Sequence, residues 1–320
     1  MNSNHLWTFT DGQAGNRRQA GALAAALDLG SIRDWALTTQ APWRWVAPRR
    51  LPGSERAFGP ALQQRLAAPP TLAIGCGRQG ALATRLFREH GARAVQILDP
   101  RIDPRHWDLV IAPEHDRLRG PNVLTLQGSL NPVDEPWLQQ ARADFIHLGD
   151  LPRPRTAVLL GGSSAHARFD RSAFETLATR LEQALARGSG SGSGSVMLTT
   201  SRRTPAEVVS AVRHRFVETP GLVWCGAHDG DNPYPGLLAW ADRIVVSPDS
   251  VNMVSEACAT HAPVFVFEPA RVRGRPRLFL ESLLRSGRVR PMDAVLAPFE
   301  SQPLRETARV AAAVRERLGL

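Results

Sequence analysis

The chain has 320 residues, of which 43% are hydrophobic and 22% charged, a composition that excludes a disordered protein and is typical of a folded one. All 39 basic residues are arginine, and with 30 acidic residues they give a net charge of +9, which favours anionic partners such as nucleotides or acidic lipid surfaces. The sequence lacks a run of about 18 apolar residues, which excludes a membrane-spanning helix, and it lacks the common nucleic-acid-binding motifs, so we expect no nucleic acid as a partner.

The first residues and the cysteines indicate where the protein works. The opening stretch, MNSNHLWTFT, lacks the charged start and apolar middle of a signal peptide. Cys76, Cys225 and Cys258 lack the paired spacing of metal ligands and cannot all form disulfides, which favours a reducing compartment. We therefore expect a cytoplasmic protein. Its basic charge also favours a location at the inner face of the cytoplasmic membrane, which is anionic.

In the first half, short apolar runs alternate with helical segments, a pattern typical of a parallel sheet covered by helices on both faces. The first strand, residues 6–10, precedes the turn DGQAGN and a helix over residues 17–29. The other predicted elements are a helix over 81–90 and strands over 71–75, 94–98, 108–113, 122–126 and 145–149.

Two prolines in LPRPR, residues 151–155, interrupt any regular element, and the same pattern then restarts. Strands are predicted over 156–162, 195–201, 222–226, 242–247 and 263–269, with helices over 172–186 and 205–216. We predict an α/β protein with two doubly wound Rossmann-like domains, residues 1–152 and 153–299, that face each other across a cleft. Residues 300–320 are predicted to form an amphipathic helix that packs back on the first domain. Residues 188–195 are four Gly-Ser repeats, typical of a flexible linker, where we expect no functional residue.

Three turns of the second domain carry residues suited to a nucleotide diphosphate. In the first, Gly161 and Gly162 let the backbone approach a phosphate closely, and the hydroxyls of Ser163 and Ser164 with nearby N–H groups can bind it. The alternative is an ordinary strand-to-helix turn.

The second turn, LTTSRRTP, ends a strand with Ser201 and continues with Arg202 and Arg203, which can neutralise a diphosphate at the carboxyl end of a parallel strand. Thr204 is the expected N-cap of the next helix, with Pro205 in its first turn. The alternative is that both arginines are ordinary surface residues.

The third turn, SPDSVNMVSEA, opens a helix whose positive end begins at Ser250, Val251 and Asn252. Either Asp249 or Ser250 can cap this helix. Glu256 lies further along it, among apolar and small residues, and its carboxylate can accept hydrogen bonds from a ribose diol. The alternative is a solvated glutamate on the helix surface.

The stretches GGSS and PYPGLLAWADRIVVSPDSVNMVSEA resemble the carboxyl-terminal half of GT-B glycosyltransferases, above all the enzymes that add N-acetylglucosamine to the undecaprenyl-linked peptidoglycan precursor. The resemblance implies that the loop Gly161-Gly162-Ser163 contacts the diphosphate. It also implies that Ser250 lies at the edge of the ligand site, where the helix begins, and that Glu256 binds the ribose. It also implies a base-reading loop near Asn232 and Tyr234.

Over most of the chain, WTFTDGQAGNRRQA and SPDSVNMVSEA resemble the plant mitochondrial-fission "elongated mitochondria" factors and their bacterial relatives. This resemblance implies a GT-B-like fold. The plant members are regarded as recruiters of a dynamin-type fission protein, so a non-catalytic, nucleotide-binding or partner-recruiting role is the alternative to catalysis.

The amino-terminal half bears on whether the chain is an enzyme. The peptidoglycan-type enzymes carry a histidine suited to act as base in the first glycine-rich turn, and DGQAGNRRQ has none. Asp11 is the ionisable acceptor in this turn, so we name it the candidate catalytic base, with Gly12, Gly15 and Asn16 on the acceptor side. The alternative is that Asp11 is only the first residue of an Asp-Gly turn.

A rival motif, Gly75-Cys-Gly77-Arg-Gln-Gly80, lies between a strand and a helix, with Asp99 closing a later strand, as dinucleotide binding requires. It favours a further alternative, an NAD-dependent nucleotide-sugar epimerase or dehydrogenase. Against it, the unit is not the first of its sheet, and the chain lacks a tyrosine–lysine pair because it has no lysine. In a GT-B protein these glycines line the acceptor side.

Two arginine-rich segments are candidates for contact with an acceptor or a membrane. APWRWVAPRR places two tryptophans among Arg44, Arg49 and Arg50, a composition suited to lipid headgroups. EPARVRGRPRLF carries four arginines, and Gly274 and Pro276 are expected to keep it a loop that clamps an anionic acceptor or the diphosphate. The alternative for both is solvated surface.

We therefore predict a metal-independent GT-B glycosyltransferase that moves a sugar from a nucleotide-sugar donor to a cell-envelope saccharide or anionic lipid, with peripheral membrane contact. Helix N-termini and arginines would stabilise the departing diphosphate in place of a metal, and we expect no Asp-x-Asp motif that could hold one. The nucleotide-sugar is the substrate, and no cofactor is expected.

Overall fold

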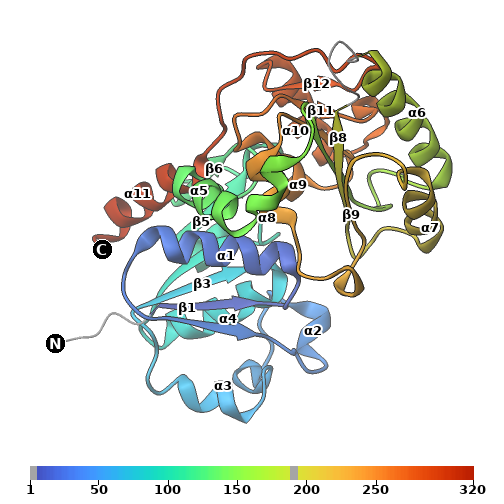
Figure 1. The fold of residues 1–320 in the computed structure, drawn as a ribbon. Coiled ribbons are helices and arrows are strands. Elements are labelled where there is room, and N and C mark those ends of the chain that lie inside the picture. Colours follow the sequence, from blue (N-terminus) through green and yellow to red (C-terminus); the bar gives the residue numbers. More distant parts are fainter. Residues whose placement is uncertain (1–5, 188–193) are drawn as a thin grey trace. The chain divides into compact units, whose positions relative to one another are not determined.

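The computed structural model describes residues 6–187 and 194–320, which divide into two compact units. The first unit consists of the chain up to Pro132 together with Glu306–Leu320. The second unit is Val133–Arg305. Each unit contains a parallel six-stranded sheet with helices on both faces (Figure 1), which confirms the predicted α/β architecture of two doubly wound sheets. The Gly-Ser repeats lie mostly outside the described residues, but Ser195 begins a strand and donates a hydrogen bond to the Pro152 carbonyl at 2.7 Å.

The sheet of the first unit has the strand order β2-β1-β3-β4-β5-β6. Its strands are β1 (Leu6–Thr10), β2 (Ile32–Ala36), β3 (Leu72–Cys76), β4 (Arg93–Ile97), β5 (Leu109–Pro113) and β6 (Val123–Leu126). The helices are α1 (Ala14–Leu27), α2 (Trp43–Val46), α3 (Pro60–Arg65), α4 (Gly77–Glu89) and α11 (Glu306–Leu318). One core lies between the sheet and α1 with α11, and another lies between the opposite face and α3 with α4. The expected carboxyl-terminal helix thus begins at Glu306 and packs on α1 within this unit.

The sheet of the second unit has the order β12-β11-β10-β7-β8-β9. Its strands are β7 (Arg155–Leu160), β8 (Ser195–Thr200), β9 (Gly221–Trp224), β10 (Arg243–Val246), β11 (Val264–Val266) and β12 (Val289–Pro291). The helices are α5 (Glu135–Asp144), α6 (Arg171–Arg187), α7 (Ala206–Arg215), α8 (Tyr234–Trp240), α9 (Val251–Cys258) and α10 (Arg275–Arg285). In β7, Ala157 and Leu159 enter the core under α8 and α9, whereas Val158 and Leu160 enter the core under α6 and α7. A strand that is buried on both faces reads as a continuous apolar run.

Three local expectations were wrong. Residues 145–149 do not form a strand, because Ile146–Asp150 is a 3₁₀ helix. Arg275–Arg285 is the helix α10, so Gly274 and Pro276 do not keep that segment a loop; Pro276 occupies the first turn, where a missing N–H costs nothing. The N-cap position of α7 is Pro205 rather than Thr204.

Candidate functional site

The second sheet reverses its direction of winding between β7 and β10, which pair in parallel. From β7 the chain adds β8 and β9 on one side, and then crosses over to add β10, β11 and β12 on the other. Open α/β sheets bind ligands outside the carboxyl ends of their strands at such a reversal. The turns after β7, β8 and β10, residues 161–164, 201–204 and 247–250, leave the sheet at this edge. We refer to them as the three turns.

Asp249 joins the three turns through its buried carboxylate. Its Oδ2 accepts a hydrogen bond from the Gly162 N–H at 3.0 Å and pairs with the Arg203 guanidinium at 2.9 Å. Its Oδ1 accepts a hydrogen bond from the Ser247 hydroxyl at 2.6 Å, and the Ser247 oxygen in turn accepts one from the Gly161 N–H at 2.7 Å. The carboxylate therefore holds the glycine turn, the arginine turn and the start of α9 in one arrangement.

Both glycines of the first turn are required by close neighbours. A Cβ atom on Gly161 would lie 2.1 Å from an Asp249 carboxylate oxygen, and one on Gly162 would lie 2.0 Å from the Arg203 carbonyl oxygen. Real Cβ atoms do not approach other atoms so closely, so any side chain here would push the turns apart. Close packing of the turns therefore explains why both positions are glycine, whether or not a ligand binds there.

The hydroxyls of the predicted site stabilise the turns themselves. Ser163 Oγ accepts the Phe169 N–H at 3.0 Å, and Ser164 Oγ accepts the Ala167 N–H at 3.1 Å. Ser201 Oγ accepts the Arg203 N–H at 3.1 Å. Thr204, the expected helix cap, instead donates its hydroxyl to the Gly161 carbonyl. A phosphate at this edge would therefore meet backbone N–H groups and arginines, or would have to replace some of these hydrogen bonds.

Two arginines follow β8. Arg203 is half-exposed, at 49%, even though it pairs with Asp249. Arg202 is exposed, and its side chain has no hydrogen bond or ion pair with any described residue. Both guanidinium groups thus stand at the surface of the three turns, where an anionic ligand can reach them.

Helix α9 is fixed at both ends. The Ser250 hydroxyl caps its start by accepting the Met253 N–H at 3.3 Å. At its other end, the buried Arg288 guanidinium donates hydrogen bonds to the carbonyls of Cys258 at 2.9 Å and Thr260 at 2.8 Å. Burial lowers the pKa of Arg288. The N–H groups of the first turn, which includes Val251 and Asn252, lack acceptors within the helix, so the positive helix end faces the three turns.

Glu256 lies inside the second unit, with only 3% of its surface exposed. Its Oε2 accepts a hydrogen bond from the hydroxyl of Tyr234 at 2.5 Å, and Tyr234, the first residue of α8, is also buried. The alternative of a solvated helix glutamate is therefore wrong. A carboxylate has about four lone-pair sites, so one phenol does not exhaust its capacity to accept hydrogen bonds.

The first glycine-rich turn, in the first unit, is closed by its own side chains. Asp11 Oδ1 accepts the Gln13 N–H at 3.1 Å and the Asn16 side-chain amide at 2.9 Å. Asn16 Oδ1 faces the Cys76 thiol at 3.5 Å, and burial raises the pKa of that thiol. Gly12 has a φ of 77°, which favours glycine, and Gly15 lies in the first turn of α1. These contacts are those of a turn residue, and they also hold the Asp11 carboxylate in a fixed position.

The second glycine motif of the first unit is explained by packing between β3 and α4. A Cβ on Gly75 would lie 2.7 Å from the Gly80 carbonyl, and one on Gly80 would lie 2.4 Å from the carbonyl of Phe9 in β1. Gly77 has a φ of 79° and begins α4 directly after β3. The three glycines thus allow the helix to start against the sheet.

The described residues contain no group of three or more His, Cys, Asp and Glu side chains that could hold a metal ion. Asp229 and Asp231 form an Asp-x-Asp sequence, so the expectation that the chain lacks this motif was wrong. Asp229 accepts hydrogen bonds from the Arg213 guanidinium and the Cys225 N–H, both at 2.7 Å, and the Arg213 contact holds the pKa of its carboxyl below the ordinary value. Asp229 thus belongs to a surface ion pair.

None of the described helices combines the length and the apolar character needed to cross a membrane.

The same fold and sequence pattern occur in known proteins. A family model described as "Mitochondrial fission ELM1" matches residues 14–318. The mitochondrial fission protein ELM1 of Arabidopsis thaliana is 30% identical over 280 residues, which are 78% of this chain. The match covers 64% of the plant protein, so this chain spans less than two thirds of that relative.

Two solved structures share the fold at low sequence identity. UDP-N-acetylglucosamine 2-epimerase from Rickettsia bellii superposes with a TM-score of 0.56 at 12% identity, covering 98% of this chain and 94% of its own. MurG from Acinetobacter baumannii superposes with a TM-score of 0.51 at 12% identity, covering 98% and 91%. At this identity the likeness shows the fold alone, which is of the GT-B type, as predicted.

Proposed function

The chain belongs to the mitochondrial fission ELM1 family, and from that premise and the geometry of the three turns we propose that it is a metal-independent GT-B glycosyltransferase. The second unit binds the nucleotide-sugar donor, and the acceptor is a cell-envelope saccharide or an anionic lipid. The protein works in the cytoplasm, at the inner face of the membrane.

The observation that carries this proposal is the arrangement of the three turns by Asp249. Segments that are far apart in the sequence meet at the reversal point of the second sheet, where α/β proteins bind ligands. A glycine backbone, two arginines and the start of α9 lie together there. This combination of N–H groups and guanidinium groups suits a diphosphate.

The same groups supply what sugar transfer requires. Charge develops on the diphosphate as the sugar leaves it, and donors fixed in advance stabilise that charge without reorganisation. Arg202 and Arg203, together with the N–H groups of Ser250, Val251 and Asn252, take this part. The proposal therefore assigns no step to a metal ion.

Glu256 is proposed as the acceptor for the ribose hydroxyls. A ribose diol is uncharged, so a carboxylate can bind it without pairing charges. Glu256 is buried and already holds the Tyr234 hydroxyl, and a ribose would join or replace that hydroxyl on the carboxylate.

Asp11 is proposed as the base that takes the proton of the acceptor hydroxyl. Its Oδ1 is occupied by Gln13 and Asn16, which fixes the plane of the carboxyl group. Turnover that is unchanged in Asp11→Asn would overturn this assignment. Gly75, Gly77 and Gly80 belong to the acceptor side of the proposal.

Peripheral membrane contact is proposed for the segment around α2. Trp45 is 64% exposed, and the Arg44 guanidinium lies 5.2 Å from the centre of its ring. Leu51 is exposed beside Arg49 and Arg50. Aromatic and aliphatic side chains among arginines suit the headgroup layer of an anionic membrane.

The second candidate function is a nucleotide-binding or partner-recruiting role without catalysis. Membership of a family described by mitochondrial fission favours it, because that description names a process and no reaction. The candidate NAD-dependent epimerase or dehydrogenase has weaker support, since packing accounts for Gly75 and Gly80 and a positive φ accounts for Gly77.

A calorimetric titration with UDP, GDP, CMP, ADP, NAD and their common sugar conjugates tests the proposal. We expect one nucleotide and its sugar conjugate to bind, and Glu256→Ala to weaken that binding by at least about tenfold, the usual effect of losing a hydrogen bond to a charged group. Glu207→Ala, which removes an exposed carboxylate of α7, is the matched control and should bind as the unchanged chain does.

The outcomes separate the candidates. Nucleotide binding would favour the non-catalytic role if the chain neither transfers the sugar to any acceptor nor hydrolyses the donor. Tight binding of NAD alone would favour the redox enzyme. A chain that binds none of these ligands is not a nucleotide-sugar enzyme, and activity that requires a divalent cation would contradict the metal-independent mechanism.

A further inference from the structure

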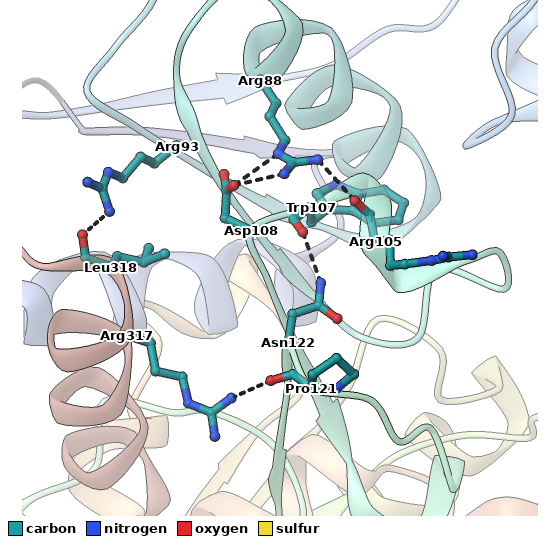
Figure 2. Close-up of a pocket in the computed structure, with 9 residues that line it drawn as sticks. All are labelled: Arg88, Arg93, Arg105, Trp107, Asp108, Pro121, Asn122, Arg317 and Leu318. Carbon is teal, nitrogen blue, oxygen red and sulfur yellow. Dashed lines mark hydrogen bonds and ion pairs between the residues drawn. The ribbon is translucent and has the colours of Figure 1, made fainter.

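A pocket of about 460 Å³ lies in the first unit, at the edge of the sheet opposite to its glycine-rich turns (Figure 2). Arg93 begins β4, Asp108 immediately precedes β5 and Asn122 immediately precedes β6, so the pocket lies at the amino ends of these parallel strands. Arg88 of α4 and Arg317 of α11 complete it together with Arg105. The proposed function uses none of these residues.

One arginine of the pocket is neutralised by its aspartate. Figure 2 shows the Arg88 guanidinium folded onto Asp108, with Nε at 3.0 Å from Oδ1 and Nη1 donating to the Arg105 carbonyl at 3.0 Å. Asp108 Oδ2 accepts the Ala94 N–H at 2.7 Å. Arg105 pairs with the exposed Asp103 at 2.6 Å, a contact that lowers the pKa of Asp103 to about 2. The one lining carboxylate is thus satisfied.

Two other arginines are held by neutral groups. The Arg93 guanidinium donates to the carbonyl of Leu318, and the Arg317 guanidinium donates to the carbonyl of Pro121 at 3.1 Å. Figure 2 shows both beside the end of α11. Among the described residues neither guanidinium pairs with a carboxylate, so both positive charges remain uncompensated. Each uses one of its five N–H donors, which leaves donors for a ligand.

We propose that this pocket binds a phosphate-bearing anion and that the ligand holds α11 against the first sheet. Guanidinium groups match phosphate oxygens in pairs, and the pocket lies in the size range of small-molecule sites. The carbonyl contacts fix Arg93 and Arg317 before binding, which reduces the entropy lost when a ligand is bound. Because Arg93 belongs to β4 and Arg317 to α11, one anion bridges the two elements.

Pyrophosphate is the probe, titrated into the full chain by calorimetry at low ionic strength. The titration uses an Arg202→Gln, Arg203→Gln background, so that the three turns of the second unit contribute little. We expect one pyrophosphate to bind per chain, and Arg93→Gln or Arg317→Gln each to weaken binding by about tenfold, as for one lost charge-assisted contact. Arg168→Gln, which removes an 85% exposed arginine of the second unit, is the control for charge and should have no effect.

A second readout follows the helix directly. Pyrophosphate should slow hydrogen exchange of amides in residues 306–318, and this effect should vanish in Arg317→Gln, whose thermal unfolding reports whether the variant is folded. Absence of binding, or binding unchanged in both variants, would overturn the site. Equal affinity for citrate would contradict phosphate selectivity, and unchanged exchange in α11 would contradict the bridging role.

Discussion

Two buried carboxylates of the candidate site have different hydrogen-bond partners. Asp249 faces an arginine, an N–H and a hydroxyl, whereas Glu256 faces the hydroxyl of Tyr234. A buried carboxylate is stable only when such partners replace water. Asp249 is therefore suited to fix the turns. Glu256 accepts a hydrogen bond from a neutral hydroxyl and is therefore suited to accept hydrogen bonds from a neutral ligand.

The change Tyr234→Phe tests the hydrogen bond on Glu256. It removes one hydroxyl and leaves the ring in place, so we expect the free energy of unfolding to fall by about 1.5 to 3 kcal/mol, the usual value for a hydrogen bond to a charged group. Urea unfolding at pH 7 measures this. If Glu256 also binds ribose, nucleotide binding should survive Tyr234→Phe and weaken at least about tenfold in Glu256→Ala. A loss below about 0.5 kcal/mol would mean that the contact contributes little to stability.

Single-residue chemistry was predictable where it depended on near neighbours. The cap by Ser250 and the apolar surroundings of Glu256 follow from residues within one or two helical turns. The contact between Asp249 and Gly162 joins residues 87 positions apart, and the contact between Tyr234 and Glu256 crosses from α8 to α9. Neither leaves a local pattern, because the sheet order brings the partners together.

At the scale of elements, α9 is positioned by groups beyond its own sequence. Arg288 lies just before β12, and it meets carbonyls at the end of α9 that no helix can satisfy internally. Cations at a helix carboxyl end are also favoured by the helix dipole. The same guanidinium thus fixes the position of Glu256 from the opposite end of its helix.

The change Arg288→Met should destabilise the second unit by about 3 kcal/mol, because it leaves buried carbonyls without donors. Urea unfolding of both proteins at pH 7 gives the difference. Arg285→Met removes an exposed arginine of α10 in the same segment and should change stability by less than about 0.5 kcal/mol. Equal effects of the two changes would contradict a capping role for Arg288.

Asp242 joins β10 to β7 at the amino edge of the second sheet. Burial raises the pKa of Asp242, but hydrogen bonds from the Arg155 N–H and guanidinium and from Arg153 outweigh it and hold the pKa below the ordinary value. A carboxyl with a lowered pKa stabilises the fold above its unfolded pKa of about 3.9, and loses that contribution as the pH falls.

The change Asp242→Asn should therefore lower stability by about 1 to 2 kcal/mol at pH 7, since the amide keeps one acceptor but loses the charge. The difference from the unchanged chain should shrink below about pH 4, because Asp242 then takes up a proton in the unfolded chain before it does so in the folded one. Urea unfolding at pH 7, 5, 4 and 3 follows this, with the exposed Asp231→Asn as control. A difference that stays constant with pH would refute the assignment.

The two strands that the sequence did not predict have weak patterns. The edge strand β2, IRDWA, is almost wholly exposed, so it lacks the apolar run that marks the buried strands. The short strand β12 has one buried residue among three. Strand β7 is buried throughout, so its apolar run identified it.

At the scale of the whole molecule, the chain builds its first unit from both of its ends. Glu306–Leu318 follows the entire second unit in sequence but packs on α1, and Val310, Ala311 and Val314 are fully buried there. The apolar face of α11 predicts that the helix is buried, and the sequence predicts that residues 300–320 pack on the first domain. The sequence predicts the end of the first domain at residue 152, whereas the two units divide between Pro132 and Val133. Helix α5 therefore belongs to the second unit, where it packs on α8.

The change Val314→Asp tests whether each unit depends on its own core. It places a charge in the core that α11 shares with Leu23 and Leu27 of α1, a change that should cost at least about 4 kcal/mol. Amides of residues 14–27 should then exchange about a thousandfold faster, because each 1.4 kcal/mol is a factor of ten. Amides of β7 and β10 should keep their protection, since their core contains no residue of α11. Ala312→Asp, on the exposed face of the same helix, should leave both units unchanged. Loss of protection in β7 as well would mean that the two units unfold together.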